Sequence, residues 1–216
     1  AAEVPEPAEP NILYGEFRQD PAAHPLKTPT GKIELYSEAI ARANPADCPP
    51  HPAWLEPAEW LGGEAARRYP LHLISNQPAT RLHSQMDGAG VSRGAKVRGR
   101  EPAWMNPADA DARGLKEGDL IRVFNGRGAT LAGLRLSDGV RRGVLLLPTG
   151  AWYDPAEPGR PGALEKHGNP NVLTLDKGSS GLGQGPVAHT ALVEAERYAG
   201  EPPPVTAFEP PALAGG

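Results

Sequence analysis

Short apolar stretches separated by turn residues run through the chain from about residue 70 to residue 198. "LIRVFNGRGATLAGLRLS" divides into two such stretches at Asn125-Gly126, a pair that is typical of a tight hairpin turn. "VLLLP" is apolar throughout and indicates a fully buried strand. The pattern predicts strands at Tyr69–Ser75, Leu120–Phe124, Ala129–Leu136, Val144–Pro148 and Thr190–Glu196.

One helix is predicted within "WMNPADADARGLKEGD". Asn106 can cap its first turn, Pro107 suits the first helical position, and Gly114 can end it in the left-handed conformation. Trp104, just before this helix, is expected in the core. Short strands, glycine-marked turns and little helix favour a closed barrel over a sheet of alternating strands and helices. We therefore expect a mainly β domain at residues 70–198, with one or two short helices.

The segments on either side of this barrel carry few signs of a core. Residues 11–69 predict an irregular, extended connecting segment, with a short strand at Lys32–Tyr36 and a helix that Ser37 caps. Residues 1–10 are rich in Pro, Glu and Ala, and residues 199–216 are rich in Pro, which is typical of disordered segments.

The composition narrows the class of protein. The 216 residues carry a formal net charge of −4, and no cluster of Lys or Arg marks a nucleic-acid surface. Hydrophobic residues make up only 39% of the chain, because 26 prolines and 26 glycines occupy many positions. No apolar run is long enough to span a membrane. A single cysteine, Cys48, excludes an internal disulfide and a cysteine-based metal site. We expect neither nucleic acid nor membrane as a partner.

Four polar stretches within the predicted barrel are the candidates for a binding site: Ser75–Gln85, Thr149–Pro155, Lys166–Thr174 and Asp176–Gly185. The first follows a strand with Ser, Asn, Gln, Arg and His in place of the usual turn residues. Such side chains carry the hydrogen-bond donors and acceptors that hold a polar ligand.

Each candidate side chain also has a purely structural interpretation. Asn171 has the pattern of a turn or capping asparagine, and Arg81 that of a solvated charge. His83 and His167 could be hydrogen-bonded histidines without a binding role, and Gln184 could belong to a flexible glycine-rich loop. The pattern alone leaves both interpretations open.

Familiar catalytic patterns are missing from the sequence. There is no G-x-S-x-G, "GSSGLGQG" lacks the Lys-Ser/Thr pair of a P-loop, and no helix follows "NGRGATLAG". Carboxylates are scattered rather than paired. We therefore expect a barrel whose loops bind a polar ligand, neutral or anionic, with no catalytic residues and no metal ligands of its own.

The same stretches resemble a known family. "YPLHLISNQPATRLHSQ", "GREPAWMNPADADARGLKEGDLIRVFNGRGATLAG", "GVLLLPTGAWYDP" and "KHGNPNVLTLDKGSSGLGQG" are together similar to the C-terminal domain of molybdopterin oxidoreductases. Within that family the sequence resembles the branch of biotin sulfoxide, dimethyl sulfoxide and trimethylamine N-oxide reductases, and leans towards the first. "FRQDPAAHPLKTPTGKIELYS" resembles the segment that leads into this domain, so the resemblance covers roughly residues 12–197.

This resemblance implies a six-stranded double-psi β-barrel that closes over molybdenum held by two molybdopterin guanine dinucleotides (bis-MGD). Complete enzymes of this kind remove an oxygen atom from an S-oxide or N-oxide, with two protons and two electrons giving water, and the cofactor carries the chemistry. The serine that ligates the metal in this branch belongs to an earlier domain. The chain is therefore expected to be a fragment that is inactive without the remaining domains of its parent polypeptide.

The matched motifs also imply which residues contact the cofactor. Amides and hydroxyls suit the polar edge of the pterin, and Arg or His suits the pyrophosphate. Gln77 stands where the family often carries a histidine, a departure that removes a possible charge. The expected cofactor-binding residues are Ser75, Gln77, Arg81, His83, Ser84, Trp152, Asp154, His167, Asn169, Asn171 and Gln184.

A second interpretation is a free-standing double-psi barrel that binds a protein or a nucleotide without redox chemistry, because one fold serves many functions. Such a module is expected to expose an apolar or charged patch rather than amide-rich loops at one end. For the enzyme fragment, the resemblance favours a cytoplasmic parent, with the periplasm as the alternative. The cofactor loops are expected to be mobile without the cofactor, because their polar groups would bond only to water.

Overall fold

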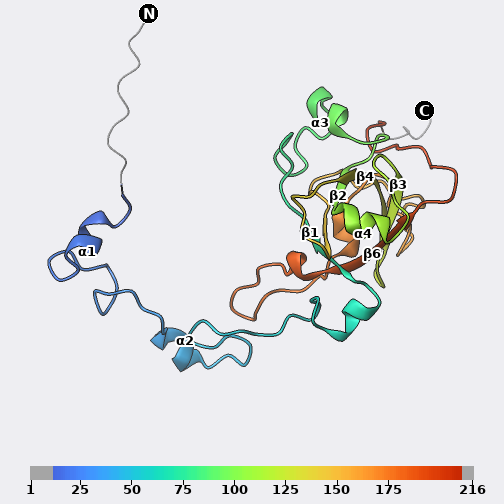
Figure 1. Ribbon diagram of the computed structural model, residues 1–216. Coiled ribbons are helices and arrows are strands. Elements are labelled where there is room, and N and C mark those ends of the chain that lie inside the picture. Colours follow the sequence, from blue (N-terminus) through green and yellow to red (C-terminus); the bar gives the residue numbers. More distant parts are fainter. Residues whose placement is uncertain (1–11, 211–216) are drawn as a thin grey trace, which may run out of the picture. The chain divides into compact units, whose positions relative to one another are not determined.

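A computed structural model describes residues 12–210 of the chain (Figure 1). The disorder expected at residues 1–10 therefore lies outside the described residues. Two compact units are present among the described residues. The first contains residues 12–55 and 180–182, and the second contains residues 56–179 and 183–210.

The first unit holds two short helices, α1 (Gly15–Gln19) and α2 (Glu38–Ala43). The second unit holds most of the secondary structure. Its elements are η1 (Glu64–Arg67), β1 (Leu71–Ile74), α3 (Gly90–Ala95), β2 (Pro102–Met105), α4 (Pro107–Asp111), β3 (Leu120–Phe124), β4 (Ala129–Leu136), β5 (Val144–Leu146), η2 (Pro170–Leu173), η3 (Ala188–Thr190) and β6 (Leu192–Arg197).

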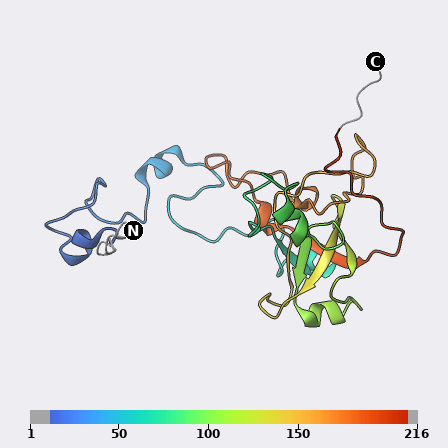
Figure 2. The same ribbon diagram turned by 90° about the horizontal axis from the view of Figure 1, so that it is seen from above.

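The strands of the second unit close into a barrel in the order β1-β5-β2-β4-β3-β6. Figures 1 and 2 show this ring of strands from two directions. β1 pairs with β5 and β2 with β4 in parallel, whereas the other neighbours are antiparallel. The predicted fold, a mainly β, six-stranded double-psi barrel with few short helices, is confirmed.

Aliphatic side chains from alternate strand positions fill the barrel. On β3, Ile121 and Val123 are fully buried, whereas Arg122 between them pairs with Glu196 of β6 at 2.9 Å. Leu73 and Leu145, from the parallel strands β1 and β5, join the same apolar core and lie opposite each other in the register. Removing these side chains from water is the main favourable contribution to folding.

The predicted hairpin is found at Leu120–Phe124 and Ala129–Leu136, with the predicted bounds. The sequence pattern missed β2, because this strand is short and begins at a proline. Ala103 and Met105 of β2 face the core, so Trp104 between them faces outwards and is 37% exposed. The expectation that Trp104 lies in the core was wrong.

The residues that begin and follow α4 are those predicted from the sequence. The Asn106 side chain accepts a hydrogen bond from the Ala108 backbone at 3.0 Å, and Pro107 occupies the first helical position. Gly114 follows the helix with a φ of 65°. This helix, labelled in Figure 1, lies against the barrel through the buried residue Ala110.

In the first unit, Ser37 caps α2 as predicted, accepting a hydrogen bond from the Ile40 backbone. The strand expected at Lys32–Tyr36 is not formed. Instead, the Glu34 carboxylate accepts hydrogen bonds from the backbone and hydroxyl of Thr30, at 3.0 and 2.9 Å, and bends the chain into a turn. A strand needs a paired neighbour, and local sequence does not supply one.

The boundary between the units falls earlier than the expected division at residue 69. Glu59 belongs to the barrel unit, where it pairs with Arg127 and accepts a hydrogen bond from the Leu192 backbone at 2.8 Å. Arg127 also donates to the Leu173 carbonyl at 2.7 Å. Residues 56–69 therefore pack with the barrel unit rather than with the connecting segment.

Residues 199–210 were expected to be disordered, yet they pack on the barrel unit. Phe208 packs against the rings of Trp152 and His167, and Thr206 is hydrogen-bonded to Asp154. The proline-rich composition indicated disorder because it offers few apolar side chains, but Phe208, Thr206 and a hydrogen bond from Arg100 to the Pro203 carbonyl anchor the segment. Residues 211–216 lie outside the described part of the chain.

Candidate functional site

Two of the predicted loops meet because the strands before them are parallel neighbours. β1 ends at Ile74 and β5 at Leu146, and these two residues are register partners. The pairing continues beyond the strands, since Thr149 donates its backbone N–H to the Asn76 carbonyl at 2.9 Å. The loops that begin at Ser75 and Thr149 therefore leave the same end of the barrel side by side.

The third loop joins them through Asn169. Its side-chain amide donates to the Ala151 carbonyl at 2.9 Å, and its side-chain oxygen accepts from the Asn171 backbone at 2.9 Å. Asn169 thereby caps the short helix η2 and ties it to the second loop. Asn171 itself is exposed, and within the described residues its side-chain amide makes no intramolecular hydrogen bond.

The three loops line an open pocket of about 450 Å³, a size typical of small-molecule sites. Five residues predicted to bind a cofactor line it, and Thr149, Gly150, Ala151 and Tyr153 are lining residues that the sequence analysis did not select. The predicted residues on the pocket wall are His83, Ser84, Trp152, Asn169 and Asn171.

Gly150 makes the close approach of the first two loops possible. Its φ is 91°, and a Cβ at this position would lie 1.9 Å from the His83 carbonyl oxygen. No side chain fits there, so glycine sets the separation of the two loops. The conformation of His83 is itself unusual for a residue with a side chain, with a φ of 49°.

Gln77 organises the first loop from within. Its side-chain oxygen accepts a hydrogen bond from the His83 backbone at 3.0 Å, and its amide nitrogen lies 2.9 Å from His83 Nδ1. Gln77 does not line the pocket, so its predicted contact with a cofactor stays a prediction. These bonds also overturn the expectation that the polar groups of the loops have only water as partners.

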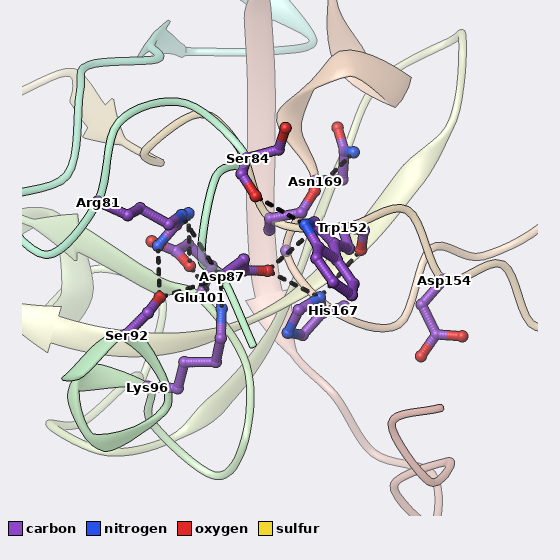
Figure 3. Close-up of polar contacts among 12 residues, drawn as sticks. Arg81, Ser84, Asp87, Ser92, Lys96, Glu101, Trp152, Asp154, His167 and Asn169 are labelled. Carbon is purple, nitrogen blue, oxygen red and sulfur yellow. Dashed lines mark hydrogen bonds and ion pairs between the residues drawn. The ribbon is translucent and has the colours of Figure 1, made fainter. Parts of the chain in front are cut away.

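Arg81 belongs to the first loop, and its side chain lies in a buried ion cluster with Asp87, Lys96 and Glu101 (Figure 3). Its side chain is 1% exposed, and its Nη2 lies 3.1 Å from the Glu101 carboxylate. Nη2 also donates to the Thr149 carbonyl at 2.9 Å, and Nε donates to the His83 carbonyl at 3.1 Å. The Arg81 side chain therefore links the first loop to the second loop.

The buried ion cluster balances two positive and two negative charges. Lys96 lies 2.8 Å from Asp87 and 2.9 Å from Glu101. Burial raises the pKa of Asp87, but hydrogen bonds from Lys96 and the Trp152 backbone, with the charges of Lys96 and Arg81, lower it more, so the net shift is downward. The carboxylate therefore stays charged, as a cluster without net charge requires.

His167 is fully buried behind the pocket rather than on its wall. Its Nδ1 lies 2.9 Å from the Trp152 carbonyl and 3.8 Å from Asp87, and within the described residues its Nε2 has no hydrogen-bond partner. Burial and the nearby Lys96 ammonium lower the pKa of His167. The neutral ring therefore supports Trp152, and its predicted cofactor contact stays a prediction.

The carboxylate that shapes the third loop, Glu165, was missed by the sequence analysis. It is fully buried and accepts backbone hydrogen bonds from Asp154, His167, Gly168 and Asn169, at 2.7 to 3.1 Å. The Thr130 hydroxyl also donates to it. Burial raises the pKa of Glu165, and these donors oppose the rise. Only the fold brings so many donors to one carboxylate, so no local sequence signal marks it.

The remaining predicted residues lie off the pocket wall. Asp154 is 5% exposed and bonds to Lys166 and Thr206 instead of facing the pocket. Ser75 is half-buried at the end of β1. Gln184 lies on the glycine-rich loop with a φ of 50°. The roles predicted for Ser75 and Gln184 stay predictions.

The chemistry of the pocket wall is polar and largely uncharged. Amides, hydroxyls, an indole and an imidazole line it, and none of the lining residues in the described part of the chain is Lys or Arg. Among residues 12–210, no group of His, Cys, Asp and Glu is arranged to hold a metal ion. No helix among them is long and apolar enough to cross a bilayer. The pocket suits a heterocycle with donors and acceptors at its edge.

A closed barrel with an amide-lined pocket at the end of two parallel strands is suited to binding a polar ligand. Residues 71–192 match the family model described as the molybdopterin dinucleotide binding domain, and the chain belongs to that family. The exposed side-chain amide of Asn171 and the hydroxyl of Ser84 fit the polar edge of such a group.

Curated relatives share about half of the residues. The chain is 52% identical to the biotin sulfoxide reductase of Cereibacter sphaeroides, covering 92% of this chain and 26% of the relative. It is 48% identical to the dimethyl sulfoxide/trimethylamine N-oxide reductase of Cereibacter sphaeroides (93% and 24% covered) and 51% identical to trimethylamine-N-oxide reductase 1 of Escherichia coli K12 (90% and 23%). The chain thus spans about a quarter of the length of these relatives.

Among solved structures, acetylene hydratase from Pelobacter acetylenicus has a similar fold. The TM-score is 0.65 at 24% identity, and the match covers 83% of this chain and 25% of that chain. At this identity the match supports the barrel fold alone.

Proposed function

We propose that this chain is the cofactor-binding domain of a molybdenum oxotransferase that reduces S-oxides or N-oxides, similar to biotin sulfoxide reductase. The observation that carries the proposal is the convergence of three matched loops on one pocket with an uncharged polar wall. When bound, molybdopterin guanine dinucleotide would supply molybdenum for oxygen-atom transfer, and this chain would hold and orient it without a catalytic residue of its own.

The pocket wall favours one part of such a cofactor. A pyrophosphate is recognised by Arg, Lys or backbone N–H groups, whereas a pterin or guanine edge needs paired neutral donors and acceptors. The wall offers the second set, through Ser84 and the exposed side-chain amide of Asn171. Arg81, expected on the pyrophosphate, already pairs with two buried carboxylates. We therefore assign a heterocycle of the cofactor to this pocket.

The remaining domains of a parent polypeptide are the proposed partner of the first unit. Large apolar side chains stand exposed there, among them Leu13 at 73%, Ile33 at 68% and Leu35 at 72%. An apolar surface of this kind is typical of an interface. Relatives about four times as long as this chain offer the domains that would cover it. A cytoplasmic location for the parent stays a prediction, which fractionation of source cells checks.

The deciding experiment measures molybdenum and releasable guanine nucleotide in the purified parent protein, expressed in a host that makes the cofactor. We expect about one metal and two guanines per chain, the composition of a bis-MGD enzyme. Reduction of biotin sulfoxide, dimethyl sulfoxide and trimethylamine N-oxide by a reduced dye then ranks the substrates. Neither metal nor guanine in the purified protein would overturn the proposal and leave the alternative of a protein- or nucleotide-binding barrel.

A further inference from the structure

We propose that the C-terminal segment, residues 203–208, contributes to ligand binding at this site, because Phe208 and Thr206 hold the second loop at the pocket. The inference rests on the proposed function for the identity of the ligand. Its geometric basis is independent of that identity, because the segment contacts Trp152, His167 and Asp154 directly.

Phe208 supports the indole of Trp152, a pocket-wall residue that is 42% exposed. The two ring centroids are 5.5 Å apart, and the Phe208 ring meets the buried His167 ring edge-on at 4.9 Å. The Arg93 guanidinium lies 5.2 Å from the centroid of the Phe208 ring. One aromatic side chain thus joins the second loop, the third loop and α3.

The segment just after the first loop leaves room for this ring at Gly88. A Cβ on Gly88 would lie 3.3 Å from Phe208 and 3.9 Å from Trp152, both by their ring carbons. The two aromatic rings therefore lie close against the backbone at Gly88. Phe208 thus contacts Trp152 of the second loop and His167 of the third loop, and Trp152 in turn bonds to Ser84 of the first loop.

Thr206 fixes the other end of the second loop through Asp154. Its backbone N–H and its hydroxyl donate to the two carboxylate oxygens of Asp154, at 2.7 and 2.6 Å. Lys166 of the third loop bridges them, with Nζ 2.9 Å from the Thr206 hydroxyl and 3.1 Å from Asp154. Figure 3 shows Asp154 apart from the buried ion cluster of Arg81, Asp87, Lys96 and Glu101.

Trp152 is also held by Ser84 of the first loop, by Asp87 just after that loop, and by His167 of the third loop, whose Nδ1 lies 2.9 Å from the Trp152 carbonyl. The Trp152 Nε1 donates to the Ser84 carbonyl at 2.7 Å, and its backbone N–H donates to Asp87 at 3.0 Å, as Figure 3 shows. The Nε1 bond fixes one edge of the indole, and the Phe208 ring packs against the indole at a tilted angle. Without the Phe208 ring, the indole is free to swing about that bond and the pocket wall loses its shape.

The test compares Phe208→Ala and Thr206→Val in the full-length parent protein with Glu209→Ala as the matched control. Glu209 is exposed in the same turn, and only its backbone is engaged, with Thr206. We expect Phe208→Ala to speed the loss of guanine nucleotide and molybdenum during dialysis about tenfold, and Thr206→Val to do so by a smaller factor. Phe208→Tyr, which keeps the ring, is expected to retain the cofactor as the wild type does.

A second readout does not depend on the cofactor. Hydrogen exchange at the Trp152 amide, whose N–H is donated to Asp87, is expected to become faster in Phe208→Ala and to stay unchanged in Glu209→Ala. Equal cofactor retention and equal exchange in Phe208→Ala and Glu209→Ala would overturn this inference. A wild-type protein without molybdenum or guanine would instead overturn the proposed function, so the two failures are distinguishable. If Phe208→Ala does not fold, Thr206→Val carries the same test.

Discussion

Gly150 and His83 come so close that a Cβ on Gly150 would lie 1.9 Å from the His83 carbonyl oxygen. The contact joins the loops that follow β1 and β5, and both residues line the pocket. The same carbonyl oxygen accepts a hydrogen bond from Arg81 at 3.1 Å. The shape of the pocket thus depends on a backbone approach that only glycine permits.

Gly150→Ala is expected to lower the free energy of unfolding by about 3 kcal/mol or more, because a left-handed backbone is strained in alanine and the new Cβ clashes with backbone. The matched control is Gly159→Ala, with a φ of 79° and open space around its Cβ. It is expected to cost only the backbone strain, about 1–2 kcal/mol. Urea denaturation of both variants measures the difference, and equal losses would show that the approach to His83 is not restrictive.

Asn171→Ala is expected to weaken cofactor retention about tenfold, the effect of losing one or two hydrogen bonds to a ligand. Stability should change by less than about 0.5 kcal/mol, because the side chain is exposed. Asn169→Ala is the comparison, since its side chain caps η2 and holds the Ala151 carbonyl. That variant should also lose about 1–2 kcal/mol of stability. Full molybdenum occupancy in Asn171→Ala would contradict the assigned role.

Arg81→Ala is expected to destabilise the barrel unit by about 3–5 kcal/mol, because it leaves Asp87 and Glu101 buried with Lys96 as their only cation in the buried ion cluster. Arg160→Ala is the control, since that exposed side chain pairs only with its neighbour Glu157. It should leave the denaturation midpoint unchanged. An Arg81→Ala protein as stable as the wild type, yet lacking cofactor, would instead indicate that Arg81 binds the ligand directly.

Stability is expected to fall as the pH drops below 6.5, because burial and Lys96 lower the pKa of His167 below its ordinary value of 6.5. The unfolded chain then binds a proton that the folded protein resists, so the contribution of His167 is complete above pH 6.5 and declines below it. The slope should reach at most about 1.4 kcal/mol per pH unit. His167→Gln keeps a donor for the Trp152 carbonyl and should flatten this slope between pH 7 and pH 5. An unchanged slope would mean that another group titrates there.

Much of the fold was predictable because it is locally encoded. The Asn125-Gly126 turn sets the hairpin of β3 and β4, and Asn106 and Gly114 bound the helical turn between them, so these elements appear where the sequence places them. The resemblance to a family then supplied the closed six-stranded barrel that the pairing confirms. β2 could not be read in the same way, because a four-residue strand gains its stability from its neighbours.

The sequence by itself determined that amide-rich loops follow the strands, and His83, Ser84, Asn169 and Asn171 indeed share one pocket wall. Only the tertiary structure decided which polar side chains face that pocket. Arg81 and His167 look like ligand-binding residues in the sequence, yet their side chains are buried and do not line the pocket. Phe208 lies in a segment with the composition of disorder, yet it packs against Trp152. The physical reason is that burial and charge pairing arise between residues far apart in the chain, and no local pattern records them.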